Sequence, residues 1–195
     1  MSRFRTLIAS LLLALCSLLA GAQAAWAAPE FPKLTGRVVD AANIIPDAEE
    51  ARLTQKLAAL EQQSNRQLVV ATVPSLQGYE ISDYGYQLGR KWGIGQKGED
   101  NGALLIVAPN ERKVRIEAGY GLEPILTDGM SFLIINKEIL PRFKKGDMTG
   151  GIEAGANAII QQLMLPPEEA QKIAAQADEQ RQSGGGISLG TVVFI

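Results

Sequence analysis

The feature that most constrains the fold is a pair of short, almost continuous apolar runs. Residues 67–73 and 103–107 each have the length of a strand. Neither run alternates regularly between apolar and polar residues, which indicates strands that are buried on both faces. A helical pattern at about 80–92 lies between them, with Ile81, Tyr84 and Leu88 on one face. A strand, a helix and a strand in this order predict a right-handed crossover between two parallel strands.

The segments around this unit add one antiparallel strand and more helices. Turn residues at 109–112 lead into a strand at 114–118, where Arg115 and Glu117 alternate with apolar residues, as is typical of an edge strand. The remaining periodicities predict a short strand at Val38–Val39 and helices at 46–64, from 130 to the residue before Pro141, and at 147–164. The sequence therefore predicts a single α/β domain with a mixed β-sheet sandwiched between helices, an αβα arrangement.

Residues 1–27 have the three-part pattern of a secretory signal peptide. Arg3 and Arg5 precede an apolar run, and Ala22-Gln23-Ala24 and Ala25-Trp26-Ala27 offer two cleavage sites. The apolar run from Leu7 to Ala20 is shorter than the roughly 20 residues that a membrane-spanning helix needs. We therefore expect an exported protein that is periplasmic or otherwise extracytoplasmic.

Removal of this signal limits the chemistry of the remaining chain. It takes away the only cysteine, Cys16, from a sequence that has no histidine. Two of the 19 Lys and Arg residues go with it and none of the 21 acidic residues, so the net charge changes from −2 to −4. The processed domain then has no group for a Ser-His-Asp triad, a thiolate nucleophile or a typical zinc site. Its mildly acidic balance argues against nucleic acid as a partner.

The other end of the chain changes composition after the predicted domain, which we place at 28–165. Residues 166–186 are rich in Ala, Gln, Glu and Lys and end in glycines, which predicts a polar stalk or linker with some helix. Residues 187–195 are apolar but too few to span a membrane. They are either a loose apolar tail or the start of a membrane anchor, and we favour the anchor.

Two polar loops are predicted to meet at one edge of the sheet. Because the second and third strands form a hairpin, the loop before 103 must approach the loop after 118. These loops carry several oxygen ligands of the kind that Ca²⁺ and Mg²⁺ prefer. The metal candidates are Asp100, Glu123 and Asp128, with Glu99 and Asn101 as secondary candidates.

A purely structural interpretation of the same residues stays open. Asp100-Asn101-Gly102 is also favourable turn chemistry. Asp128 is placed to cap the third helix, and Glu123 can simply be solvated. The glycines at 93–98 follow a helix and precede a strand, which is the reverse of a phosphate-binding loop, so we expect no organic cofactor.

Several motifs, taken together, resemble the TPM domain. They are Val39-Asp40 with Asn43-Ile44-Ile45, Trp92-Gly93-Ile94-Gly95, Asp100-Asn101-Gly102-Ala103-Leu104-Leu105, Gly119-Tyr120-Gly121-Leu122-Glu123 and Thr127-Asp128. The resemblance covers about residues 36–164 and implies an exported α/β sandwich, commonly followed by a membrane anchor. Members of the family include a thylakoid-lumen protein described as an acid phosphatase and marine bacterial proteins that bind calcium. Asp100, Glu123 and Asp128 fall on the acidic loop motifs of that family, but no family nucleophile can be placed on this chain.

Three functions follow as hypotheses. The first is a monomeric, membrane-tethered domain that binds a divalent cation and assists the assembly, repair or turnover of membrane-protein complexes by direct contact. The second is a metal-dependent phosphomonoesterase in which the cation activates water. The third is a structural module whose glycines serve only turns.

Overall fold

A computed structural model describes residues 28–183 and 192–193, and its helices and strands belong to one compact unit, Phe31–Ile195. The predicted signal peptide and most of the predicted apolar tail lie outside the described residues. Within the described part of the chain, none of the helices is both long enough and apolar enough to cross a membrane. In chain order the elements are β1 (Val38–Asp40), α2 (Asp47–Ser64), β2 (Gln67–Thr72), α3 (Ile81–Trp92), β3 (Gly102–Ala108), β4 (Lys113–Ala118), η1 (Tyr120–Leu122), α4 (Asp128–Ile134), η2 (Ile135–Ile139), α5 (Leu140–Phe143), α6 (Met148–Met164), α7 (Pro167–Ser183) and β5 (Val192–Val193).

The strands form one mixed sheet in the order β1-β2-β3-β4-β5. β1, β2 and β3 are parallel, with Val38 opposite Val70 and Val70 opposite Leu105. β4 runs antiparallel to β3, and the two-residue β5 pairs antiparallel with the start of β4. The predicted parallel pair and the predicted hairpin are therefore both present.

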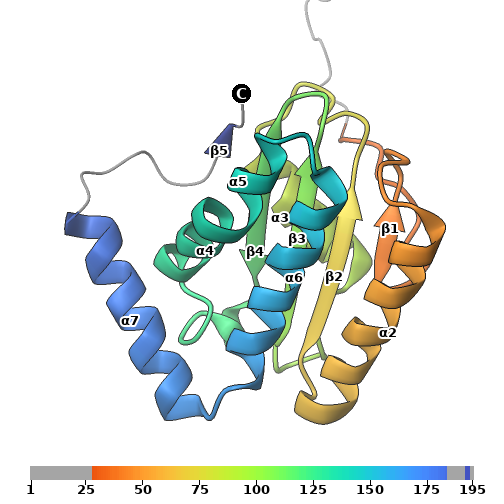
Figure 1. Cartoon of the computed structure of the whole chain (residues 1–195). Helices are drawn as coiled ribbons and strands as arrows, with labels where there is room; N and C mark the ends of the chain where they lie inside the picture. The colour runs from red at the N-terminus through yellow and green to blue at the C-terminus, as the bar shows by residue number, and fades with distance from the viewer. Residues whose placement is uncertain (1–27, 184–191, 194–195) are drawn as a thin grey trace, which may run out of the picture. The chain divides into compact units, whose positions relative to one another are not determined.

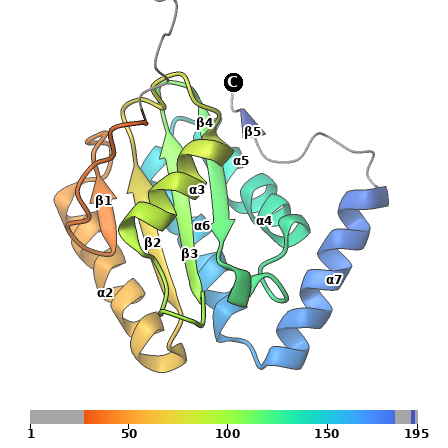
Figure 2. The ribbon, with the colours of Figure 1, turned by 180° about the vertical axis from the view of Figure 1, so that it is seen from behind.

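Helices cover both faces of this sheet, which confirms the predicted αβα arrangement. Figure 1 shows α2, α6 and α4 in front of the strands, and Figure 2 shows α3 on the opposite face. Side chains of β2 alternate between the two layers: Leu68 and Val70 join the larger core cluster, and Val69 and Ala71 join the cluster beneath α3. β2 and β3 lack the usual polar alternation because both of their faces are buried.

The third helical region does not end before Pro141 as the sequence predicted. α4 continues as a π-helical turn, η2, and then as α5, which contains Pro141 in its first turn. In the wider turn the N–H of Leu140 donates to the carbonyl of Ile135. A proline has no N–H to donate, but in the first turn of a new helical segment that donor is not needed.

The segment expected to be a polar linker is helix α7, and it packs on the domain. Ala170, Ala174 and Ala177 recur at helical spacing and are buried. They lie against α4, beside which α7 runs in both ribbon views (Figures 1 and 2). The helix agrees with the expectation of some helix in this segment. Its packing on α4 rests on alanine, which also suits a solvated helix, so the sequence pattern does not reveal it.

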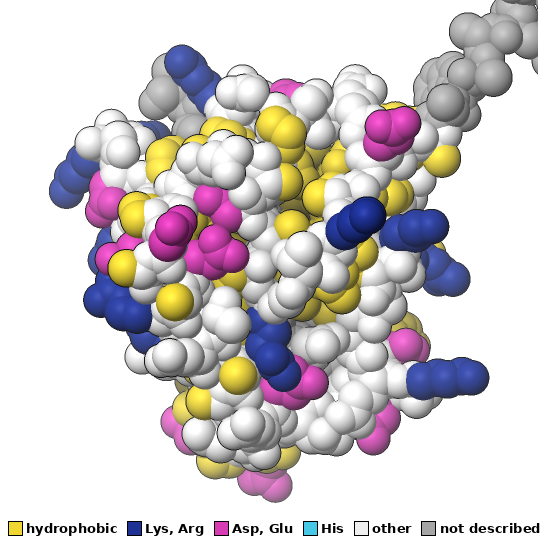
Figure 3. Space-filling model, turned by 90° about the vertical axis from the view of Figure 1, so that its right-hand side faces the viewer, with side chains coloured by type: hydrophobic (Ala, Val, Ile, Leu, Met, Phe, Trp, Pro, Cys, Tyr) yellow, Lys and Arg dark blue, Asp and Glu magenta, His cyan; other side chains and the backbone are white. Residues whose placement is uncertain are grey.

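The surface on the β1 and α2 side carries charges of both signs. Figure 3 shows acidic and basic side chains spread over this face, with hydrophobic side chains gathered between them. The potential of exposed charges is screened by salt within a Debye length of about 8–10 Å, and here both signs are present. This face therefore presents no field of a single sign.

Candidate functional site

The two polar loops meet as the hairpin predicted. Ala103 pairs with Ala118 at the end of the β3–β4 ladder, so the loops continue side by side from this point. The N–H of Gly119 donates to the carbonyl of Gly102 at 2.7 Å, and the N–H of Gly121 donates to the carbonyl of Asp100 at 3.1 Å. Residues 98–102 and 119–128 are called the loop pair below.

Glycine is required where the loops touch. A Cβ atom on Gly119 would lie 2.2 Å from the carbonyl oxygen of Asp100, and one on Gly121 would lie 2.0 Å from that of Glu99. Backbone oxygens cannot be pushed aside as the end of a flexible side chain can, so any larger residue would force the loops apart. The two backbones are therefore in direct contact, and carbonyl groups of one loop face the other.

Asn101 fixes the shape of the first loop. Its side chain is only 8% exposed. The amide nitrogen donates to the carbonyl of Asn65 and to a carboxylate oxygen of Glu99, each at 2.7 Å, and the amide oxygen accepts the N–H of Gln96 at 2.8 Å. Both ends of the amide are thus used within the protein, which favours a structural role for Asn101 over a metal-ligand role.

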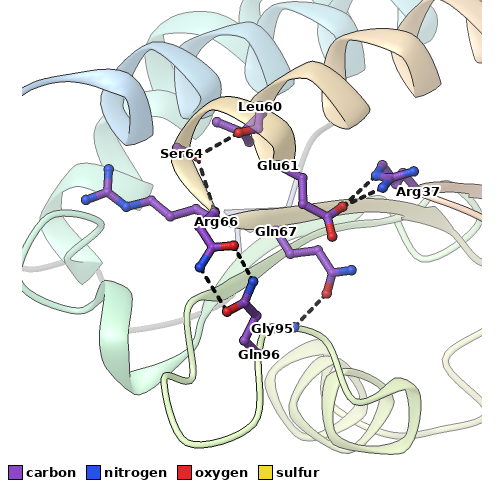
Figure 4. A network of polar contacts seen from close by, with 9 residues as sticks. Arg37, Leu60, Glu61, Ser64, Arg66, Gln67, Gly95 and Gln96 are labelled. Carbon is purple, nitrogen blue, oxygen red and sulfur yellow. Dashed lines mark hydrogen bonds and ion pairs between the residues drawn. The ribbon is translucent and has the colours of Figure 1, made fainter.

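Side chains from the junction of α2 and β2 form hydrogen bonds with residues 95 and 96, just before the first loop. The sequence pattern did not predict these contacts. Asn65 donates to the side-chain oxygen of Gln96 at 2.9 Å, and the side-chain oxygen of Gln67 accepts the N–H of Gly95 at 2.6 Å. Figure 4 shows this network, with Arg37 and Glu61 paired beside it. Asn65 is the left-handed C-cap of α2, with φ of 60°. An asparagine directly after an amphipathic helix was the available signal.

The three principal metal candidates all lie on exposed positions of the loop pair. Asp100 adopts a left-handed conformation with φ of 48°, Glu123 follows η1, and Asp128 is the first residue of α4. Thr127, and not Asp128, caps α4, because its hydroxyl oxygen accepts the N–H of Met130 at 3.1 Å. Over the residues that the structure describes, no three acidic side chains are grouped so as to hold a metal ion together. The fold brings the loops together without gathering their carboxylates into a ligand set.

A half-buried ion pair lies beside this edge. Arg115 and Glu117 are neighbours on the face of β4 that α3 covers, with Nη2 of Arg115 at 3.3 Å from Oε2 of Glu117. Burial raises the pKa of Glu117, and the hydrogen bond and charge of Arg115 oppose that rise. Asp128 and Asp83 raise the pKa of Glu117 further through their negative charges. Asp128 therefore contributes to a negative potential that reaches the sheet.

Asp40 lies at the opposite edge and has a different task. Its two carboxylate oxygens accept the N–H groups of Ile44 and Ile45 at 3.2 and 2.8 Å, and Thr72 donates its hydroxyl to the same group. Asp40 thus braces the chain before α2.

Comparison with protein families and solved structures places this fold among known ones. A family model described as the TPM domain matches residues 38–162. The N-terminal domain of a protein from P. gingivalis is 34% identical with a TM-score of 0.62, over 67% of this chain and 82% of that one. The N-terminal domain of the cg2496 protein from Corynebacterium glutamicum is 17% identical with a TM-score of 0.53, over 72% and 88% of the two chains.

A third solved structure is the BA42 protein from the psychrophilic bacterium Bizionia argentinensis. It is 18% identical with a TM-score of 0.54, over 62% of this chain and 81% of that one. At the identity of the last two structures, the likeness extends to the fold alone. A comparison with curated proteins finds no match.

Proposed function

The chain belongs to the TPM domain family, and on this premise we propose that it is an exported, membrane-associated TPM domain whose loop pair binds a divalent cation, Ca²⁺ or Mg²⁺. The observation that carries the proposal is the hydrogen bond from the N–H of Gly121 to the carbonyl of Asp100. This contact joins the two loops that carry Asp100, Glu123 and Asp128, whose side chains are exposed.

The chemistry of this edge suits a hard cation. Ca²⁺ takes six to eight oxygen ligands from carboxylates, carbonyls and water in a flexible geometry. The loop backbones are already ordered by Asn101 and by the glycine contacts, so only exposed side chains and water have to rearrange. Their rotation costs less than ordering a loop, because about 1–2 kcal/mol per residue is needed to fix a backbone.

The proposed biological role is contact with membrane-protein complexes during their assembly, repair or turnover. The predicted signal peptide and the predicted anchor support a location outside the cytoplasm and beside a membrane. Tyr120 supports the contact role, since it is 78% exposed in the second loop and tyrosine is enriched at protein interfaces. Fractionation of cells that make the full chain tests the location: uncleaved chain recovered in the cytoplasm would contradict it.

Calorimetric titration of Ca²⁺ and Mg²⁺ into the purified chain tests the cation site. We expect Asp100→Asn, Glu123→Gln and Asp128→Asn each to weaken binding by about tenfold, a loss of roughly 1.4 kcal/mol. Asp47→Asn is the matched control, because it removes one exposed carboxylate from the start of α2. Equal affinity in all four variants would show that the cation binds elsewhere, and no heat of binding in the unaltered chain would show that it does not bind.

The phosphomonoesterase alternative gains no specific support from the described residues. It would need the same cation and, in addition, a base beside it.

A further inference from the structure

Helix α7 lies outside the part of the chain that the family model matches, yet it is built into the domain. The model ends at residue 162, and α7 covers Pro167–Ser183. Its buried alanines form one continuous face against α4, and the guanidinium of Arg181 lies over the ring of Phe132 at 5.4 Å. An addition of this kind can change how the family's loops are held in this chain.

The first connection from α7 to the loop pair runs through Asp178. Its Oδ1 accepts the N–H of Gly129 at 2.9 Å. Gly129 directly follows Asp128, so α7 ties down the residue next to a proposed ligand. The fit is tight, because a Cβ atom on Gly129 would lie 2.2 Å from that oxygen and 2.7 Å from the Cα of Asp178.

The second connection runs through a buried side chain. Gln162 of α6 is 2% exposed, and its amide nitrogen donates to two carbonyls at once. One is that of Ala170 in α7, at 2.9 Å, and the other is that of Ile125 in the loop pair, at 2.6 Å. A displacement of α7 would leave one N–H of the buried Gln162 amide without its acceptor, which is unfavourable.

We propose that α7 positions the second loop of the loop pair, with Asp178 as the positioning residue for Asp128. The inference rests on the proposed function, since it assigns to α7 the control of cation affinity at that site. Docked α7 holds Gly129 directly through Asp178, and it shares the amide of Gln162 in α6 with Ile125. These contacts hold the segment that carries Glu123 and Asp128 at two points. When α7 leaves α4, this segment is free to move and the cation is bound more weakly.

Substitutions at Asp178 in the full chain test the proposal with two readouts. Asp178→Ala removes the acceptor, so the amide of Gly129 should exchange with solvent about tenfold faster or more by NMR. The same variant should bind Ca²⁺ about fivefold more weakly or worse. Asp178→Asn keeps an acceptor oxygen and should restore both the protection of Gly129 and the affinity for Ca²⁺.

A second pair of variants tests docking itself. Ala174→Glu places a carboxylate in the buried face of α7, whereas Ala175→Glu places one on the neighbouring exposed position. We expect fast exchange of α7 amides and weaker Ca²⁺ binding only in the first. If Ala174→Glu prevents folding, the two Asp178 variants carry the test.

The possible outcomes distinguish the contact, the positioning role and the proposed function. Full protection of Gly129 in Asp178→Ala would overturn the contact, and loss of protection with unchanged Ca²⁺ affinity would overturn the positioning role while the proposed function stands. A lack of Ca²⁺ binding by the unaltered chain would overturn the proposed function and the positioning role together, and it is recognised without any variant.

Discussion

At the scale of single residues, the polar and acidic candidates separate into different roles. The side chains of Asn101 and Asp40 form hydrogen bonds within the protein that shape loops. Asp100, Glu123 and Asp128 lie on exposed positions instead. Spacing alone could not make this separation, because it depends on which side chain points inward. The Asn65, Gln67 and Gln96 contacts were also beyond the sequence, since they join segments about 30 residues apart.

Glu117 gives a prediction about pH. Burial raises its pKa above that of an unfolded chain, so the folded state binds protons more tightly than the unfolded state does. Its charged form therefore costs stability, and this cost is absent below the unfolded pKa and complete above the folded pKa. We therefore expect Glu117→Gln to change the free energy of unfolding in the stabilising direction at pH 7 relative to its effect at pH 4. Urea denaturation at the two pH values measures this difference.

Glu153 provides a control of opposite sign. A hydrogen bond from Lys56 lowers the pKa of Glu153, so its charged form contributes stability that is lost as pH falls through the folded pKa. Glu153→Gln should accordingly lower the free energy of unfolding more at pH 7 than at pH 4. The same sign of pH dependence in both variants would contradict this account of Glu117.

At the scale of elements, the pattern of apolar residues predicted most of the fold. The strands at Gln67–Thr72 and Gly102–Ala108 and the helices at Asp47–Ser64 and Met148–Met164 lie within a residue or two of their expected positions. The deviations occur where local rules are overridden by packing. The helix that passes Pro141 needs a π-helical turn, and the docking of α7 depends on a partner surface on α4 that no local pattern reveals.

The contact between the loops gives a prediction at this scale. Gly121→Ala should destabilise the protein by about 1–3 kcal/mol, because the new methyl group meets the carbonyl of Glu99 and the loops must separate. Gly89→Ala is the matched control: it adds a methyl group to helix α3 where no atom lies within 4 Å, and should stabilise by roughly 0.5–1 kcal/mol. Thermal denaturation of both variants measures the effect, and a neutral Gly121→Ala would contradict the tight contact.

At the scale of the whole molecule, two different sets of polar groups lie at the two ends of the strands. One edge holds Asp40 and the turn before α2, where polar groups are satisfied internally. The other edge holds the loop pair, where backbones are fixed and carboxylates stay exposed. The topology of this arrangement was predictable from the order of strands, whereas the orientation of each carboxylate was not. We expect the cation to bind at the second edge, as proposed above.

The most direct test is a Ca²⁺ titration of the isotopically labelled chain followed by amide NMR signals, residue by residue. We expect saturable shifts for amides at 98–102 and 119–128, and unchanged signals for amides at 40–45 at the opposite end of the strands. Signals of the loop pair that stay in place up to millimolar Ca²⁺, the weak end of the range of about 10⁻⁹ to 10⁻³ M for protein calcium sites, would contradict this expectation.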